Sequence, residues 1–275
     1  MARSAATRKL IDALRVKPRS KVSLGRVDAG QTFGHDKASV LATEAELEAN
    51  LTSLQQRLWA EAKHPVLIVL QGMDASGKDG TMAKVMRAFN PMGCSVTAFK
   101  TPTPVELSHD YLWRVHPHAP AKGSIAIFNR SHYENVLVVR VHELVPAAVW
   151  RKRYRQINDW ERMLVEEGTT IVKLFLHIDK DEQRERLQAR LGDPTKRWKF
   201  SMGDLAERAL WDAYMKAYED CLERTSTAAA PWYLIPANHR WFRNLAVSMI
   251  VEDTIERLDP RYPPPPPGID KIVIE

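Results

Sequence analysis

The octapeptide Gly72-Met73-Asp74-Ala75-Ser76-Gly77-Lys78-Asp79 joins an apolar run to a helical pattern. The run before it, Val66 to Leu70, is typical of a buried strand. After it, Met82, Val85, Met86 and Phe89 recur at helical spacing. A strand, the pattern Gly-x-x-x-x-Gly-Lys and a helix together are typical of a phosphate-binding P-loop. The alternative is a glycine-rich turn with a solvated lysine, and the flanking strand and helix favour the phosphate site.

Two glycines and one lysine give this loop its predicted affinity for anions. Gly72 and Gly77 permit a tight turn in which successive backbone N–H groups point to one anion. The positive end of the helix dipole adds to the attraction, and Lys78 supplies a mobile positive charge. We therefore predict that Gly72, Gly77 and Lys78 bind phosphate.

Asp79 stands where P-loops usually carry the Ser or Thr whose hydroxyl binds Mg²⁺. It could bind the cation itself, or it could serve as the negative residue that a helix N-terminus favours. Asp74 lies inside the loop and would repel a phosphate unless a cation bridged the two. We therefore prefer Asp74 as the metal residue and assign Asp79 to phosphate binding. The expected cation is Mg²⁺, with Mn²⁺ as the alternative.

Length and composition predict one large domain, or a domain with a small appendage. The 275 residues can bury a core without cross-links. Cys94 and Cys221 are the only cysteines and have no metal-ligand spacing, so we expect a cytoplasmic protein. The apolar runs are strand-sized and the basic start lacks a secretion signal, so we expect no membrane partner. A net charge of +6 and a pI of about 9.3 favour polyanionic partners.

Apolar runs and helical patterns alternate along the chain. Residues 1–42 are polar and irregular, and we expect an arm that wraps the domain or a partner subunit. Five strands are expected at 66–70, 95–99, 125–128, 170–178 and 232–236. Helices are expected at 43–58 with a capping box of Thr43 and Glu46, at 78–89, 105–115, 146–167, 179–191 and 205–222, and up to 258. Residues 261–275 form a proline-rich, extended tail.

These alternating elements predict an α/β fold, with a parallel five-stranded sheet and helices on both faces, over residues 43–260. Such sheets bind ligands at the carboxyl ends of their strands. The polar residues that follow the strands should therefore lie together: Asp74, Lys78, Lys100, Asn129, Arg130 and Asp179. The four histidines at 116, 118, 132 and 142 lack metal-ligand spacing, so we expect them to make ordinary hydrogen bonds.

A basic segment after the fourth strand predicts a lid over about 184–205. We expect Arg184 and Arg186 to lie on a solvated helix face. The remaining basic residues are expected to close over phosphates and exclude water: Arg190, Lys196, Arg197 and Lys199. Trp198, which lies between two of them, is the aromatic residue that could touch a ligand.

Further motifs follow in order along the chain. They are Phe99-Lys100-Thr101-Pro102-Thr103-Pro104 with Leu107-Ser108-His109-Asp110 and Trp113-Arg114, Phe128-Asn129-Arg130-Ser131-His132-Tyr133-Glu134, Lys196-Arg197-Trp198-Lys199-Phe200-Ser201, Trp211-Asp212-Ala213-Tyr214 and Ala230-Pro231-Trp232. With the octapeptide, and from about Lys37 to Leu258, this series resembles the polyphosphate kinase 2 family. Several separated motifs in one order are far more specific than a P-loop alone.

The resemblance implies a thymidylate-kinase-like P-loop fold. It also implies reversible, Mg²⁺-assisted transfer of the terminal phosphoryl group of inorganic polyphosphate to a nucleotide. The sequence at 129–134 is similar to the branch that accepts AMP as well as diphosphates such as ADP and GDP. The resemblance associates Glu134, and with it Asn129, with the acceptor nucleotide. Other branches carry Asp where this chain has Asn129, so we assign Asn129 no direct metal role.

The residues themselves suggest how such a transfer would run. Phosphoryl transfer needs positioning and charge neutralisation more than covalent help. A cation on Asp74 would bridge donor and acceptor phosphates, Lys78 would stabilise the transferring group, and Arg130 would bind it bidentately. Lys100 and Arg114 would hold acceptor or chain phosphates. A nucleotide phosphate is already ionised at neutral pH, so no general base is needed.

Two other functions fit parts of the pattern. One is an ATP-dependent nucleoside monophosphate kinase, in which the lid would cover ATP. The other is a non-catalytic P-loop protein that binds RNA or polyphosphate. The clustering of basic residues near the expected pocket, without an aromatic and basic recognition pattern, argues against a nucleic-acid partner. The N-terminal arm and the helix with Trp150 favour a homo-oligomer, a dimer or a tetramer.

Overall fold

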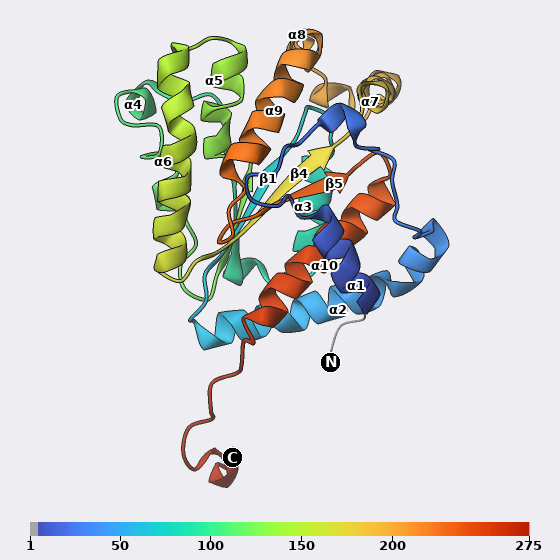
Figure 1. Ribbon diagram of the computed structural model, residues 1–275. Helices are drawn as coiled ribbons and strands as arrows, with labels where there is room; N and C mark the ends of the chain where they lie inside the picture. The colour runs from blue at the N-terminus through green and yellow to red at the C-terminus, as the bar shows by residue number, and fades with distance from the viewer. Residues whose placement is uncertain (1–4, 275) are drawn as a thin grey trace.

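The predicted parallel sheet is present and places the P-loop strand at its centre (Figure 1). A computed structural model describes residues 5–274 of the chain. The strands are β1 (Val66–Gln71), β2 (Cys94–Ala98), β3 (Ile125–Asn129), β4 (Thr170–His177) and β5 (Trp232–Pro236), in the spatial order β2-β3-β1-β4-β5. All pair in parallel, so their carboxyl ends meet at one edge of the sheet.

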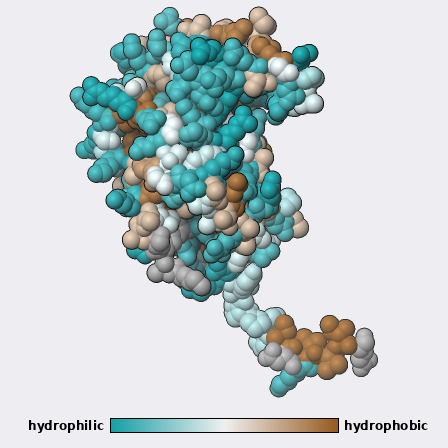
Figure 2. Space-filling view, turned by 90° about the vertical axis from the view of Figure 1, so that its right-hand side faces the viewer, coloured by the Kyte–Doolittle hydropathy of each residue, from teal (hydrophilic) through white to brown (hydrophobic). Residues whose placement is uncertain are grey.

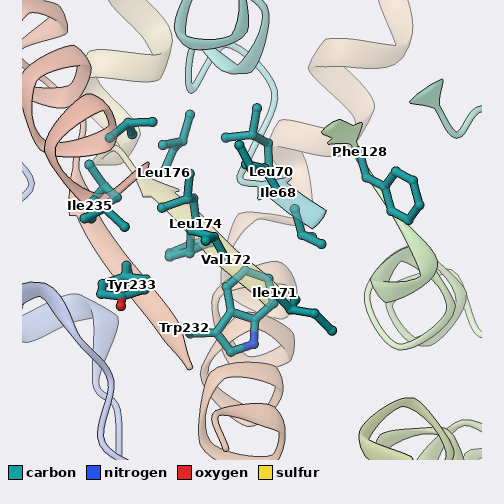
Figure 3. Close-up of a cluster of buried hydrophobic side chains, with 14 of the residues drawn as sticks. Ile68, Leu70, Phe128, Ile171, Val172, Leu174, Leu176, Trp232, Tyr233 and Ile235 are labelled. Atoms are coloured by element: carbon teal, nitrogen blue, oxygen red, sulfur yellow. The ribbon is translucent and has the colours of Figure 1, made fainter. Parts of the chain in front are cut away.

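The central strands form the core because helices cover both faces of the sheet. Every residue of β1 is buried. Figure 3 shows Ile68 and Leu70 with Val172 and Leu174, which are their register partners on β4. This burial explains the nearly continuous apolar runs, since a parallel strand covered on both faces has no solvated side to carry polar residues.

Ten helices and six short 3-10 turns are found among residues 5–274. The helices are α1 (Ala5–Leu14), α2 (Lys37–Glu61), α3 (Lys78–Met86), α4 (Pro104–Leu107), α5 (Val138–Val141), α6 (Ala147–Glu166), α7 (Lys180–Gly192), α8 (Met202–Ala209), α9 (Trp211–Thr225) and α10 (Arg240–Arg257). The turns are η1 (Leu24–Arg26), η2 (Pro91–Gly93), η3 (His116–His118), η4 (His132–Asn135), η5 (Arg197–Lys199) and η6 (Ile269–Lys271). Helices α1, α2, α3 and α10 gather on one face, and α5, α6 and α9 on the other (Figure 1).

The N-terminal segment is more regular than we predicted. Helix α1 lies within the expected irregular arm and buries Leu10, Ile11 and Leu14. It packs against α10 and β5, and the N–H of Val16 donates to the carbonyl of Trp232 at 2.8 Å. Residues 1–4 of the predicted arm lie outside the described residues. The described part from α1 onward therefore contributes to the core of the domain.

Helix α2 begins at Lys37, so the predicted start at Thr43 is wrong. Asp36 caps the helix by accepting a hydrogen bond from the N–H of Ser39. The Thr43 hydroxyl instead donates to the Val40 carbonyl at 3.1 Å, inside the helix. Both positions have cap chemistry, and burial of Val40 favours the longer helix.

Three other predicted helices differ in length or continuity. Helix α4 ends at Leu107, which is exposed, and the predicted stripe to residue 115 continues as turns. The helix predicted at 205–222 is two helices, α8 and α9, which meet at Leu210. Helix α3 ends at Met86 instead of residue 89. None of these breaks contains Gly or Pro, so the local sequence gave no signal for them.

The C-terminal tail leaves the body of the domain (Figure 1). Residues 261–267 have no regular structure and are exposed, and residue 275 lies outside the described part. At the far end, Ile272, Val273 and Ile274 are exposed and form the brown cluster at the tip of the tail in Figure 2. Within residues 5–274, no helix combines the length and apolar character that crossing a membrane requires.

Candidate active site

The P-loop connects β1 to α3 in a turn that requires glycine at two positions. Gly72 has a φ of +153°, and a Cβ there would lie 2.7 Å from both the Leu176 carbonyl and the Ser76 hydroxyl. Gly77 has a φ of +100°, and a Cβ there would overlap the Arg243 guanidinium. Residues with a side chain rarely adopt such φ values. The loop can therefore present the N-terminus of α3 to an anion at close range.

The Lys78 ammonium lies over this loop. Its Nζ donates to the carbonyl oxygens of Gly72 at 2.7 Å and Met73 at 3.1 Å. Burial lowers the pKa of Lys78, and the nearby Asp74 carboxylate opposes this shift. Because both hydrogen-bond partners are neutral, the charge of Lys78 is available to an anionic ligand.

Arg130 reaches the P-loop from the end of β3. Its Nη2 donates to Oδ1 of Asp74 at 2.7 Å. The backbone of Arg130 has a φ of +60°, a left-handed conformation that is unusual for arginine and turns the chain sharply after Asn129. The Arg130 side chain remains 44% exposed, so its other donors face solvent and the cavity.

Glu134 lies behind Arg130 and Lys78. Its carboxylate accepts a hydrogen bond from Nε2 of Gln71 at 2.9 Å. Burial raises the pKa of Glu134, and Arg130 and Lys78 oppose the increase. Glu134 is partly exposed but is not among the residues that line the cavity, and the charges of both cations act on it.

The opposite rim of the site is formed by the ends of β2 and β3. Nδ2 of Asn129 donates to Oδ1 of Asp79 at 2.9 Å. The carbonyl of Lys100 accepts from Nη2 of Arg114 at 2.9 Å, and Arg114 also pairs with Glu106 at 3.3 Å. Arg114 thus supports the backbone that carries Lys100.

A cavity of about 810 Å³ lies along these strand ends. Ten of the predicted site residues line it: Asp74, Gly77, Lys78, Asp79, Lys100, Asn129, Arg130, Arg190, Lys196 and Lys199. The other four do not: Gly72, Arg114, Glu134 and Arg197. The topology therefore brings together residues that are separated by more than a hundred positions in the chain. This agrees with the rule that open parallel sheets bind ligands at the carboxyl ends of their strands.

Two of the predicted placements are wrong. Asp179 does not join the cluster, because it caps α7 by accepting from the N–H of Glu182 at 2.7 Å and pairs with Asn238. Arg197 is not among the residues that line the cavity, and its Nε donates to the Leu191 carbonyl at 2.8 Å. Both side chains serve the local backbone instead.

Arg186 is the largest correction to the predicted lid. We expected it on a solvated face of its helix, but it is 6% exposed. Its guanidinium pairs with Glu182 at 2.6 Å and donates to four backbone carbonyls, those of Ala75, Ser76, Ala237 and Asn238. Arg186 thus joins the P-loop to the segment after β5. Sequence reasoning also missed three further charged residues of the cavity lining: Asp204, Arg240 and Arg243.

The lid segment consists of the end of α7, η5 and the start of α8. Trp198 is 77% exposed, and Nζ of Lys199 lies 5.0 Å from the centre of its ring. Lys196 pairs with Asp193, and Arg190 pairs with Asp204 at 3.4 Å. The segment is basic and lines the cavity, but only its ends are helical.

The donor set of the site fits a cation that keeps several waters and shares the phosphates of its substrate. Among residues 5–274, no three His, Cys, Asp or Glu side chains converge as a complete metal site. Asp74 presents one carboxylate to the cavity and has Arg130 on one oxygen only. Mg²⁺ is usually held in this way, by one or two carboxylates and by phosphate oxygens.

Three of the four histidines make side-chain hydrogen bonds, as we predicted. Nε2 of His132 lies 3.2 Å from Glu161, and Nε2 of His142 lies 3.0 Å from Glu207. His116 accepts from the indole of Trp160 at 3.2 Å. The ring of His118 packs edge-on against Phe99.

The chain is similar in sequence and structure to the members of one enzyme family. Residues 34–263 match the family described as Polyphosphate kinase 2 (PPK2). The AMP/ADP-polyphosphate phosphotransferase of Meiothermus ruber is 56% identical over 263 residues, which cover 95% of this chain and 98% of that protein. The ADP-polyphosphate phosphotransferase of Rhodopseudomonas palustris is 44% identical, with 95% of each chain covered. The crystal structure of Polyphosphate Kinase 2 from Arthrobacter aurescens TC1 matches with a TM-score of 0.91 and 45% identity, over 95% of this chain and 94% of that one.

Proposed function

The chain belongs to the polyphosphate kinase 2 family, and we propose that it transfers the terminal phosphoryl group of inorganic polyphosphate to ADP, GDP and AMP, reversibly. The observation that carries this proposal is the convergence of Asp74, Lys78 and Arg130 on one cavity from two separate segments, the P-loop and the turn after β3. The names of the relatives support polyphosphate, AMP and ADP as substrates, because one is named an AMP/ADP-polyphosphate phosphotransferase and the other an ADP-polyphosphate phosphotransferase.

The P-loop would bind and orient the phosphoryl group that is transferred. Lys78 would move from the carbonyls of Gly72 and Met73 to oxygens of the donor phosphate, while the loop N–H groups hold the same group. Arg130 would bind the transferring group through the donors that Asp74 does not use. Positioned cations of this kind stabilise the charge that develops on the phosphoryl oxygens.

A divalent cation would be held by Asp74 together with phosphate oxygens of both substrates. When bound, it would neutralise charge between donor and acceptor and polarise the transferring group. Asp79 is the second candidate carboxylate, and its hydrogen bond from Asn129 leaves one oxygen free. The attacking phosphate oxygen of the nucleotide is already ionised near neutral pH, so the chain needs no general base.

Glu134 would favour AMP as an acceptor without contacting it. Its carboxylate fixes Gln71 and faces Arg130, so it would set the position of the guanidinium that meets the acceptor phosphate. Lys100, held by Arg114 at the opposite rim, would bind that phosphate. The lid residues Arg190, Lys196 and Lys199 would exclude water once the substrates are bound.

Product analysis with separate donors and acceptors tests the proposal. Long-chain polyphosphate is offered with AMP, ADP or GDP, and ATP is offered with AMP. We expect ADP, ATP and GTP from the polyphosphate reactions, each at a higher rate than ATP supports with AMP. Lys78→Met protein purified in parallel controls for contaminating kinases.

Two results would contradict different parts of the proposal. A higher rate with ATP than with polyphosphate would favour an ATP-dependent nucleoside monophosphate kinase. Product from ADP and GDP but none from AMP would leave polyphosphate transfer in place and remove the role that we assign to Glu134.

A further inference from the structure

Arg243 is a buried cation that borders the cavity. It lies in the first turn of α10 and is 3% exposed, yet it belongs to the cavity lining. Its guanidinium lies directly against the backbone of Gly77, where it occupies the space that a Cβ would need. Gly77 of the P-loop and Arg243 are therefore neighbours, although they lie 166 positions apart in the sequence.

No carboxylate neutralises Arg243 within the described part of the chain. Its Nε and Nη2 both donate to Oδ1 of the adjacent Asn244, at 3.2 and 2.9 Å. Its Nη1 is 3.5 Å from the Ser76 carbonyl, which is a long and weak hydrogen bond. Arg186, by comparison, has Glu182 and four carbonyls.

The surroundings of Arg243 add positive charge instead of removing it. Burial, followed by Arg186 and Arg240, lowers the pKa of Arg243 to about 10. Arg240 lies one turn earlier on α10, is exposed, and lines the same part of the cavity. Removing a charge from water without a counter-ion is unfavourable. An anion from outside the chain would remove that cost.

The two ends of the cavity differ in charge. At the β2 and β3 end, Lys100 is accompanied by Asp79 and Asn129. At the α10 end, Arg240 and Arg243 lie next to the P-loop with Arg186 behind them. A nucleoside would leave these guanidinium groups uncompensated, whereas a polyphosphate chain carries about one charge on each successive phosphate.

We propose that Arg240 and Arg243 form a subsite for the part of the polyphosphate chain that extends beyond the P-loop, so that the donor enters from the α10 end and the nucleotide occupies the β2 and β3 end. This inference rests on the proposed function for the identity of the anion. Guanidinium groups bind phosphate oxygens bidentately, and a chain seated on both residues would gain affinity with length.

Binding and kinetics of Arg243→Gln and Arg240→Gln test the subsite, with Arg184→Gln as the matched control. Arg184 lies on the outer face of α7 and pairs with Asp181, away from the cavity. In calorimetry without nucleotide, we expect the affinity of Arg243→Gln for long-chain polyphosphate to fall about tenfold and that for pyrophosphate to fall less than twofold. The KM for polyphosphate should rise by a similar factor, and the KM for ADP by less than twofold. Arg240→Gln should show the same pattern at about threefold.

Several outcomes would overturn the inference. A raised KM for ADP with unchanged polyphosphate affinity would place the nucleotide at this end. Equal losses for pyrophosphate and long-chain polyphosphate would make Arg243 a support of the P-loop only. If both variants kept the wild-type affinity for long-chain polyphosphate, Arg240 and Arg243 would not form a subsite. If Arg243→Gln does not fold, the exposed Arg240 decides alone. Because binding is measured without turnover, a wild type that binds polyphosphate but forms no product would contradict the proposed function and leave this test intact.

Discussion

Two clusters of charged and polar side chains are linked by the turn after β3. They differ in how completely each cation is compensated by carboxylates and hydrogen bonds within the chain. The buried cluster consists of Lys173, Glu161, Tyr133 and His132. Lys173 Nζ donates to Glu161 at 2.6 Å, to Tyr133 at 2.9 Å and to the Thr225 carbonyl at 2.7 Å. These three bonds use every donor of the Lys173 ammonium, so this cation needs no partner from outside the chain.

The cavity cluster is open by comparison. Nine Lys and Arg side chains but only three carboxylates line it within residues 5–274. Among the described residues, Lys78 is bonded only to carbonyl oxygens and Arg243 has no carboxylate partner. The difference indicates that a structural ion cluster balances its charges internally, whereas a binding site retains an excess that its ligand neutralises.

The two clusters are joined through one short segment. His132 and Tyr133 belong to η4, which begins two residues after Arg130 and also carries Glu134. Tyr133 donates to Oε1 of Glu161 at 2.6 Å, so the buried cluster anchors the backbone that presents Arg130. The buried cluster therefore positions Arg130, which is part of the cavity cluster.

Removing the Lys78 charge should have the largest effect and should act on catalysis. For Lys78→Met we expect kcat/KM with polyphosphate and ADP to fall about 10³-fold, roughly 4 kcal/mol of transition-state stabilisation. The free energy of unfolding should change by less than about 1 kcal/mol, because the partners of this lysine at hydrogen-bond distance within residues 5–274 are neutral carbonyl oxygens. Steady-state kinetics and urea unfolding measure the two quantities.

Lys84→Met is the matched control for this prediction. Lys84 lies on the same helix but pairs with Glu44 at 2.9 Å, outside the cavity. We expect it to retain kcat/KM within about threefold. If Lys78→Met kept more than a tenth of the wild-type kcat/KM, the cavity cluster would not act through the excess positive charge that Lys78 contributes.

Removing the Glu161 charge should act on stability instead. For Glu161→Gln we expect the free energy of unfolding to fall by about 3 kcal/mol, because Lys173 would keep a buried charge without a counter-ion. This loss of stability should lie near the lower end of the range for buried ion pairs that lose one partner, because glutamine preserves the shape of the side chain and one acceptor oxygen. The folded fraction should keep the KM for polyphosphate within about twofold.

Glu166→Gln provides the comparison on the same helix. Glu166 is exposed and pairs with Arg162 at 3.7 Å, so its removal should cost less than about 0.5 kcal/mol. Equal unfolding curves for the two variants would show that the buried cluster does not depend on its charges.

Most of the fold could be predicted because the strands are apolar throughout and the P-loop motif has a fixed context. The strand at Trp232–Pro236 was predicted with its observed bounds. The site could be predicted as far as residues follow strand ends, as Lys100 and Arg130 do. The same rule failed for Asp179, whose side chain caps α7.

The remaining errors concern residues whose partners are distant in sequence. Arg186 belongs to a basic run that resembles a solvated face, and only the fold brings it to carbonyls of the P-loop and of the segment after β5. Arg243 lies on a helix stripe without any motif. The break at Leu210 and the helix at Ala5–Leu14 likewise depend on tertiary packing, which overrides local propensity.

The smallest effect concerns the protonation of His132 in the buried cluster. Burial lowers the pKa of His132 below its ordinary value of 6.5, although Glu161 opposes the shift. The unfolded chain therefore binds a proton below pH 6.5 that the folded chain does not, and the stability that His132 contributes is present above pH 6.5 and is lost as the pH falls. We expect the wild type to lose about 1 kcal/mol more than His132→Gln between pH 7 and pH 5.

Urea unfolding of the wild type and of His132→Gln between pH 5 and pH 7 measures how steeply the free energy of unfolding changes with pH in each protein. The comparison with the variant cancels the contributions of other buried groups, such as Glu134, whose raised pKa acts in the opposite direction. Above pH 7 the two profiles should run parallel, which serves as the internal control. A variant with the same acid sensitivity as the wild type would show that His132 takes up its proton without opening the cluster. In that case the buried cluster would tolerate an added charge, and the contrast with the cavity would rest on Lys173 and Glu161 alone.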